Sequence, residues 1–375
     1  MIELDNLHYD YRAIDGYNKP FNFVVSPREP GKTSMMWLKK IYWGWKEDHR
    51  PWIYIVRQSV EITDALIESI ADTTLNKFTD DEVKFDYKSS NFKDGIVDVY
   101  ILERVKKTQM IQENGEFKET EVEEIKKSLF FRIVALSIKM RRIKLAVLKD
   151  IKNVFMDEYI INPRMQEKYL PMEAEKIKEA FTTWRRENPK IKFYFAGNPY
   201  SLHNPLFMDW NVEIAKCKLN TFYVGDIFVI HFATLSEGLR AKLLEENPLY
   251  KFDEDYADYA LYGKPINDKN IRIDTTMPKN FHLRFVMRNK GTNLCIYQTN
   301  DFNEDFTFYV KESNEFGVNR DIYCFEFEEL VERSIVMSLD ERLRLQKFKD
   351  AFRKRLVVFY DINCYYLIEE IYKNI

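Results

Sequence analysis

The amino-acid sequence predicts an α/β fold with a mainly parallel sheet, followed by a second, α+β part. An apolar run at 21–25 leads through a short loop into residues compatible with a helix. Strand-like and helix-like segments then alternate up to residue 201, which is typical of parallel strands joined by helices. Most segments between 270 and 328 are strand-like, and the last fifty residues have helical patterns. Two differently built parts are therefore expected.

The first part has a regular order of elements. Apolar and β-branched residues predict strands at 21–25, 51–58, 128–138, 152–158 and 190–201. Helical spacing of apolar residues predicts helices at 60–75 and 174–188. Segment 81–127 interrupts this order, because short alternating runs separated by turn-prone residues predict a β-rich insert that leaves the sheet and returns to it.

A chain of 375 residues is long enough for two domains, each with its own core. We expect the first domain at 1–203. The strand–helix alternation is lost after this point, so residues 204–235 are expected to form a small linker subdomain. A second domain is expected at 236–375, beginning with a short helix at 236–250.

The composition is that of a soluble globular protein, with 45% hydrophobic and 31% charged residues. A net charge of −3 gives no whole-surface attraction to polyanions, but it does not exclude local basic patches. The four cysteines lie far apart without a CxxC pattern, which favours free thiols in a reducing compartment over a zinc site. No apolar run reaches membrane-spanning length and the N-terminus is too polar for a signal peptide. We therefore expect an intracellular protein without a membrane partner.

Residues 21–34, FNFVVSPREPGKTS, have the layout of a loop that wraps the phosphates of a nucleotide. Backbone N–H groups at the helix start would bind the anion, Lys32 would reach the β- and γ-phosphates, and the Thr33 hydroxyl would hold Mg²⁺. The usual pattern opens with glycine where this chain has Ser26, and serine adopts positive φ less readily than glycine. ATP and Mg²⁺ are the expected cofactors. The loop residues expected to contact them are Ser26, Arg28, Gly31, Lys32, Thr33 and Ser34.

Asp157 and Glu158 follow the apolar run 154–156. On a central strand beside the phosphate loop, Asp157 would ligate Mg²⁺ and Glu158 would be the general base that polarises the attacking water. The alternative is a pair of ordinary strand-end carboxylates. Because adjacent residues of a strand point to opposite faces, the catalytic interpretation requires the strand to end here, so that Glu158 turns toward the γ-phosphate.

Two further polar residues end predicted strands. Asn198, between a glycine and a proline, would contact the γ-phosphate or the attacking water, and the alternative is an ordinary turn asparagine. Arg57 ends the strand at 51–58. It would touch phosphate or a neighbouring subunit, unless it forms a structural salt bridge.

Arg185 and Arg186 lie at the end of the predicted helix 174–188. Arginines at this position usually interact favourably with the helix dipole. In a ring-shaped ATPase, such an arginine can instead reach the γ-phosphate of the next subunit, an effect worth about 10³–10⁵ in rate. Arg185 is the stronger candidate for that role, and Arg28 is another candidate for phosphate or intersubunit contact.

Two stretches of the chain are strongly basic. Residues 126–152 contain nine Lys and Arg against one acidic residue, and residues 342–355 contain seven against one. Either stretch would attract a phosphate backbone, in a way that salt weakens. A solvated face or a protein-docking surface is the alternative for each.

The motifs SPREPGKTS, IYIVRQ, NVFMDEYI and WRRENPKIKFYFAGNPYS resemble, in order and spacing, those of the genome-packaging ATPases of small short-tailed, phi29-like bacteriophages, which are related to large terminases. The resemblance covers residues 15–205 and is weaker beyond them. It implies an additional-strand P-loop ATPase domain that works in a homomeric ring, a pentamer in such motors. The ring would sit at the portal of an empty capsid in the host cytoplasm and drive double-stranded DNA inward, with a scaffold RNA as a further candidate partner.

The resemblance also implies roles for individual residues. It places Lys32 in the phosphate loop, Asp157 and Glu158 at the Mg²⁺ and catalytic-base positions, and Asn198 at the position that couples hydrolysis to movement. It places Arg185 where the family has its trans-acting arginine. The remaining candidates for contact with a neighbouring subunit or with DNA are Arg57, Arg141, Arg142, Lys144 and Arg186.

Large terminases carry an RNase H-like nuclease after the ATPase, with clustered carboxylates that bind two metal ions. The C-terminal strands here are compatible with that fold, but they offer no clear carboxylate cluster, although Asp301, Glu304 and Asp305 follow a strand. We therefore expect an inactive nuclease-like domain that contacts the portal or nucleic acid. The alternatives are a full terminase with a working nuclease and a nucleotide-gated nucleic-acid-binding module.

Overall fold

The structure, a computed structural model, describes residues 8–28, 31–79, 82–113, 116–162, 168–202, 204–212, 217–263, 271–277, 279–289, 291–299, 307–315, 322–324, 330–332, 334–336, 345–354 and 356–372. The chain forms two compact units, residues 1–266 and 267–375. Each unit has its own sheet and its own core. Within these ranges no helix is long and apolar enough to span a membrane, and none of the four cysteines forms a disulfide.

The first unit is built on a nine-stranded sheet in the order β3-β4-β5-β2-β6-β7-β1-β9-β8. Its strands are β1 (Phe21–Val25), β2 (Trp52–Val56), β3 (Lys84–Asp86), β4 (Ile96–Glu113), β5 (Glu116–Ala135), β6 (Val154–Met156), β7 (Phe193–Gly197), β8 (Thr221–Val224) and β9 (Phe228–Phe232). From β5 across to β9 all neighbours are parallel, and the pairs at both edges are antiparallel. The expected mainly parallel sheet is confirmed, and β7 lies between β1 and β6.

Helices cover both faces of this sheet, which is why its central strands are continuous apolar runs. One face carries α2 (Lys32–Met35), a π-helical segment at 36–42, α3 (Trp43–Asp48), α4 (Asp64–Ser69), a second π-helical segment at 70–75 and α5 (Asn76–Phe78). The other carries α6 (Met140–Leu145), α7 (Glu173–Glu187) and α8 (Pro205–Asp209). Alternate strand residues divide between the two cores, with Val24 and Tyr54 in one and Phe23 and Ile53 in the other. The short helix α1 (Arg12–Asp15) precedes β1.

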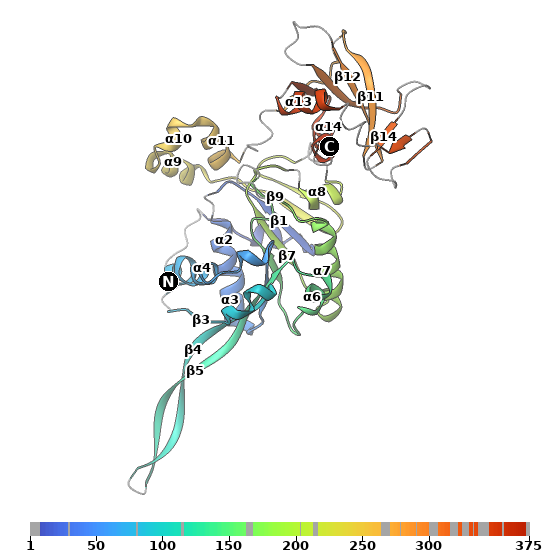
Figure 1. The fold of residues 1–375 in the computed structure, drawn as a ribbon. Coiled ribbons are helices and arrows are strands. Elements are labelled where there is room, and N and C mark those ends of the chain that lie inside the picture. The colour runs from blue at the N-terminus through green and yellow to red at the C-terminus, as the bar shows by residue number, and fades with distance from the viewer. Residues whose placement is uncertain are drawn as a thin grey trace. The chain divides into compact units, whose positions relative to one another are not determined.

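The strands β4 and β5 form a long hairpin that projects from the sheet (Figure 1). Its base is part of the sheet, because β4 pairs with β3 and residues 131–135 of β5 pair with β2. Beyond Leu102 and Ser128 the described strands pair only with each other. The expected β-rich insert is present, but the strand expected at 128–138 is the end of one longer strand.

The stretch 204–235 is not the separate linker subdomain that the sequence predicted. Its strand β9 pairs in parallel with β1, from Phe21↔Phe228 to Val25↔Phe232, and is buried in the first unit. The helices α9 (Glu237–Glu246), α10 (Leu249–Phe252) and α11 (Glu254–Tyr262) also belong to this unit. The division therefore falls near residue 266 rather than 203. The prediction was wrong because β8 and β9 follow one another without a helix, so the strand–helix alternation stops before the sheet does.

The second unit has a seven-stranded sheet in the order β10-β16-β13-β12-β11-β14-β15. Its elements are β10 (Arg272–Ile273), β11 (His282–Asn289), β12 (Thr292–Gln298), β13 (Phe308–Glu312), β14 (Ile322–Cys324), β15 (Ser334–Val336), α13 (Gln346–Arg353), β16 (Val357–Phe359) and α14 (Ile362–Tyr372). Side chains of α13 and α14, such as Phe348 and Ile368, pack on Met287 and Ile296 of the sheet. The expected C-terminal strands and helices are present, but β16 separates the two helices.

Candidate active site

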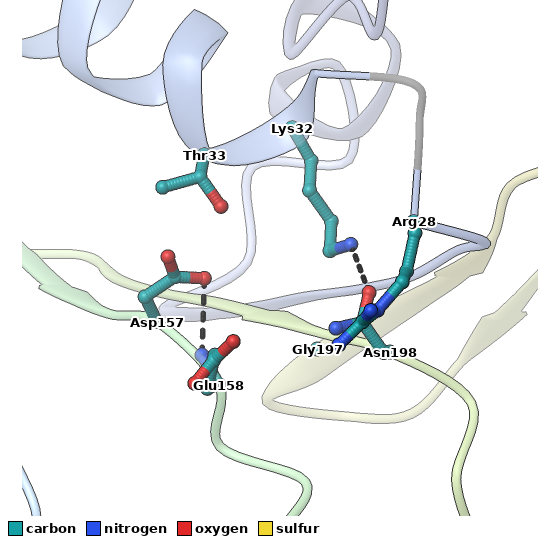
Figure 2. A pocket seen from close by; sticks show the side chains of 7 residues that line it. All are labelled: Arg28, Lys32, Thr33, Asp157, Glu158, Gly197 and Asn198. Carbon is teal, nitrogen blue, oxygen red and sulfur yellow. Dashed lines mark hydrogen bonds between the residues drawn. The ribbon is translucent and has the colours of Figure 1, made fainter. Parts of the chain in front are cut away.

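The phosphate loop and the ends of β6 and β7 surround a cavity of about 250 Å³ in the first unit (Figure 2). The residues that line it are Arg28, Lys32, Thr33, Asp157, Glu158, Gly197 and Asn198. Because β1, β6 and β7 are parallel neighbours, their carboxyl ends meet at one edge, where open α/β sheets bind ligands. Three motifs that are far apart in the sequence thus come together in one cavity.

The phosphate loop makes its sharp turn at Gly31 and not at Ser26. Gly31 has φ +64°, and a Cβ atom there would lie 2.7 Å from Cδ2 of His8, so only glycine fits without strain. Ser26 is buried and is not among the described residues with positive φ. Its backbone N–H donates to the Gly197 carbonyl at 3.2 Å and its hydroxyl donates to the Pro27 carbonyl at 3.1 Å. The serine is therefore compatible with the loop that this chain forms.

Lys32 is the first residue of α2 and is only 5% exposed. Its ammonium group donates to the Asn198 amide oxygen at 2.6 Å and to the Pro27 carbonyl at 3.2 Å (Figure 2). Both acceptors are neutral oxygen atoms. The positive charge, close to the first N–H groups of a helix, makes this part of the cavity suited to an anion.

Asp157 follows the end of β6 and is half-buried beside Thr33 (Figure 2). Burial raises the pKa of its carboxyl group to about 6, and the negative charge of Glu158 adds to this, whereas Lys32 and a hydrogen bond from Thr33 oppose it. A carboxylate in such surroundings favours a compensating cation. The Thr33 hydroxyl and the Asp157 carboxylate are hard oxygen donors, the kind that Mg²⁺ prefers.

Glu158 is exposed at the cavity, and the strand ends before it, as the catalytic interpretation required. Its φ of +48° is a left-handed conformation, which a non-glycine residue rarely adopts. Its backbone N–H donates to Oδ1 of Asp157 at 3.0 Å (Figure 2). This turn takes Glu158 out of the alternation of β6, so that both carboxylates border the same cavity.

Asn198 and Arg28 complete the lining on the β7 side. Asn198 is 7% exposed and follows the last residue of β7, where it accepts the hydrogen bond from Lys32. Arg28 donates from Nη2 to the Tyr200 hydroxyl at 3.1 Å. Ser34, expected among the nucleotide contacts, lies on α2 outside the cavity lining.

Other predicted residues lie away from the cavity. Arg185 and Arg186 are exposed in the last turn of α7, and the Arg185 guanidinium lies 5.6 Å from the centre of the Phe181 ring. On α6, Arg142 pairs with Asp94 at 3.3 Å and Lys144 pairs with Glu179 at 2.5 Å. Arg141 is exposed beside them.

Arg57 forms the structural salt bridge that was one of the two alternatives considered for it. Its side chain is 10% exposed and forms a bidentate ion pair with Glu173, which is 2% exposed. Such a paired geometry fixes the orientation of the guanidinium group, and the phosphate or intersubunit contact of Arg57 stays a prediction.

Sequence reasoning did not identify the N-terminal segment as part of the site. The buried Tyr11 donates its hydroxyl hydrogen to the Lys32 carbonyl at 3.0 Å, and His8 packs against Gly31. Tyrosine and histidine before a strand carry no pattern that predicts such contacts. Glu173 was missed for the same reason, since an acidic residue at a helix start is common.

The fold of the chain is similar to those of two solved packaging motors. The bacteriophage Phi-29 viral genome packaging motor assembly matches with a TM-score of 0.62 and 17% identity, over 98% of this chain and 99% of that chain. The Phi-28 DNA packaging motor matches with a TM-score of 0.57 and 13% identity, over 95% of each chain. No protein-family model matches the sequence, and no curated protein matches it. The resemblance seen in the sequence is thus confirmed as a likeness of fold over nearly the whole chain.

Proposed function

We propose that this chain is the ATP-hydrolysing subunit of a homomeric ring that drives double-stranded viral DNA into a preformed capsid in the host cytoplasm. The observation that carries the proposal is the cavity in which Lys32, Thr33, Asp157, Glu158 and Asn198 converge. The proposal also draws on the fold, because the likeness to the two packaging motors extends over nearly the whole length of both chains in each comparison. The resemblance of the sequence motifs to packaging ATPases further implies a pentameric ring, with a portal and a scaffold RNA as partners.

Each residue of the cavity has a definite role in this proposal. The phosphates of ATP would bind to Lys32 and to the N–H groups at the start of α2. Thr33 and Asp157 would hold Mg²⁺, which when bound neutralises charge on the phosphate oxygens. Glu158 would orient the attacking water and accept its proton. Asn198 would lose its bond from Lys32 when the ammonium turns to phosphate, which would couple the nucleotide state to β7.

A neighbouring subunit would complete the site. Arg185 is exposed on α7 and does not line the cavity of its own chain, as expected of a residue that acts on the next subunit. Arg141 is the proposed second trans residue, because Arg142 and Lys144 on the same helix already have carboxylate partners. Both would stabilise negative charge on the γ-phosphate in the transition state.

We propose that the second unit is RNase H-like in fold and inactive as a nuclease. The strands β13, β12 and β11 are joined in antiparallel pairs, and β14 and β15 extend the sheet in parallel from β11. The central strands β11 and β12 contain no Asp or Glu, whereas a two-metal nuclease needs carboxylates that converge there. Asp301, Glu304 and Asp305 lie outside the described residues. The unit would instead contact the portal, the DNA or a scaffold RNA.

Two assays test these proposals. With Mg²⁺, assembled rings of the full-length chain should hydrolyse ATP, and Glu158→Gln should lower turnover about 10²–10⁴-fold while leaving ATP binding intact. Turnover at the wild-type rate in Glu158→Gln rings would overturn the assignment, and a wild-type ring that binds ATP without hydrolysing it would favour a nucleotide-gated module. Incubation with plasmid and Mn²⁺ should give no cutting. Cutting that is lost on substitution of Asp301 or Asp305 would support a full terminase.

A further inference from the structure

Glu158, the candidate general base, has a backbone conformation that contacts with other residues must stabilise. Glu158 has φ +48°, and a left-handed non-glycine residue persists only where its surroundings fix it. The hydrogen bond from its own N–H to Asp157 is local to the turn. A second set of contacts, made by Arg57 at the end of the neighbouring strand β2, reaches the carbonyl groups on the other side of Glu158.

Arg57 binds both ends of the segment that runs from Glu158 to Glu173. At the start of the segment, its Nη1 donates to the Glu158 carbonyl at 3.4 Å and its Nη2 to the Tyr159 carbonyl at 3.0 Å. At the end, its Nε and Nη2 donate to the Glu173 carboxylate at 2.9 and 3.0 Å. Glu173 also accepts a hydrogen bond from the backbone N–H of Leu170 at 2.9 Å. One guanidinium group thus fixes where this segment leaves the sheet and where it enters α7.

The surroundings of Arg57 make this arrangement rigid. Its backbone N–H donates to Glu61 at 3.1 Å, and its guanidinium lies 5.3 Å from the centre of the Tyr169 ring. The planar guanidinium and the carboxylate of Glu173 define each other's orientation through two parallel bonds. The hydrogen bonds from Arg57 to the carbonyls of Glu158 and Tyr159 are additional to the salt bridge that joins the end of β2 to α7.

We propose that Arg57 is a positioning residue for Glu158, acting through the carbonyl groups of Glu158 and Tyr159 and held in place by Glu173. This inference rests on the proposed function, in which Glu158 acts on the attacking water. Displacing a catalytic group by about 1 Å can cost about 10²-fold in rate. Loss of the Arg57 contacts should therefore reduce turnover without removing any group that binds ATP.

The test is a paired substitution, Arg57→Met with Glu173→Leu, in assembled rings of the full-length chain. Both charges are removed together because either one alone would be left buried without its partner. The matched control is Arg132→Met with Asp98→Leu. That pair has the same bidentate geometry in the same sheet, at 2.6 and 2.8 Å, and Arg132 also donates to a backbone carbonyl, that of Ala146, at 2.9 Å. None of these control residues lines the cavity.

Four quantities are measured for each variant: kcat for ATP hydrolysis, KM for ATP, the melting temperature, and hydrogen exchange of the backbone amides at 157–161. The Arg57 and Glu173 variant should lose about 10- to 100-fold in kcat, with KM changed less than about twofold, and its amides at 157–161 should exchange faster. The control should keep its kcat and its exchange at 157–161, whatever its melting temperature. Added to Glu158→Gln, the Arg57 and Glu173 changes should lower kcat no further.

An unchanged kcat, an equal loss in the control, or unchanged exchange at 157–161 would overturn the inference. If the paired variant does not fold, Arg57→Lys takes its place, because a lysine keeps the charge but cannot bond to the carboxylate and both carbonyls together. Wild-type turnover in Glu158→Gln would instead remove the proposed function. In that case the exchange measurement still decides whether Arg57 fixes the segment.

Discussion

Gly31→Ala tests whether the phosphate loop has the geometry that the site requires. A left-handed backbone at φ +64° costs an alanine about 1–2 kcal/mol. The new Cβ would also lie 2.7 Å from Cδ2 of His8, where carbon atoms normally pack about 3.5–4.0 Å apart. Relieving such an overpacked contact costs about 1–3 kcal/mol. We therefore expect the free energy of unfolding to fall by about 2–5 kcal/mol and ATP affinity to fall with it.

Urea unfolding followed by tryptophan fluorescence, together with equilibrium ATP binding, measures both effects. Adding His8→Ala to Gly31→Ala removes the contact but not the backbone strain, so about 1–3 kcal/mol should be recovered in a double-mutant cycle. Gly16→Ala is the control, because its φ is −58° and its Cβ would lie 3.9 Å from the nearest atom. A Gly31→Ala protein with unchanged unfolding and unchanged ATP affinity would refute the loop geometry.

Three further predictions concern other parts of the first unit. Lys32→Ala should weaken ATP binding roughly 10- to 100-fold in equilibrium titration, because a hydrogen bond to a charged group contributes about 1.5–3 kcal/mol; unchanged affinity would contradict the site. Replacing residues 104–125 by an Asn-Gly turn should leave the melting temperature and ATP affinity unchanged. The reason is that this part of the β4–β5 hairpin pairs only with itself and adds no described core residue. A clear loss of stability would contradict this prediction. Burial lowers the pKa of His231 to about 4 in the folded protein, whereas the unfolded chain takes up this proton near pH 6.5. The free energy of unfolding is therefore highest above pH 6.5, as far as His231 is concerned, and it decreases as pH falls toward 4. His231→Gln should therefore flatten the fall in melting temperature over that range, and an unchanged pH profile would contradict it.

Local sequence was sufficient for the parts of the site that short motifs define. The loop with Gly31 and Lys32, and the carboxylates after β6, could be predicted because each follows directly on a buried apolar strand. Their meeting in one cavity follows from the parallel sheet, in which strand ends share an edge. The sequence also placed Asn198 at the end of the next strand.

Contacts between distant residues could not be predicted in the same way. Arg57 and Glu173 are 116 positions apart, and an arginine after a strand and a glutamate at a helix start are each common, so nothing local indicates that they pair. The place of β9 beside β1 was missed because it depends on long-range strand pairing and not on the pattern of 228–232 itself. The hydrogen bond from Arg57, which follows β2, to the carbonyl of the left-handed Glu158 could not be predicted for the same reason.

The central claim is that one subunit supplies Glu158 to a hydrolytic site and the next supplies Arg185. The most direct measurement is the ATPase rate of assembled rings made from Arg185→Ala subunits, from Glu158→Gln subunits, and from a mixture of the two. Each variant alone should hydrolyse ATP at least about 10²-fold more slowly than the wild type. The mixture should recover activity, because an intact Glu158 then meets an intact Arg185 at some subunit boundaries. A mixture no faster than its components, or an Arg185→Ala ring with the wild-type rate, would contradict the account.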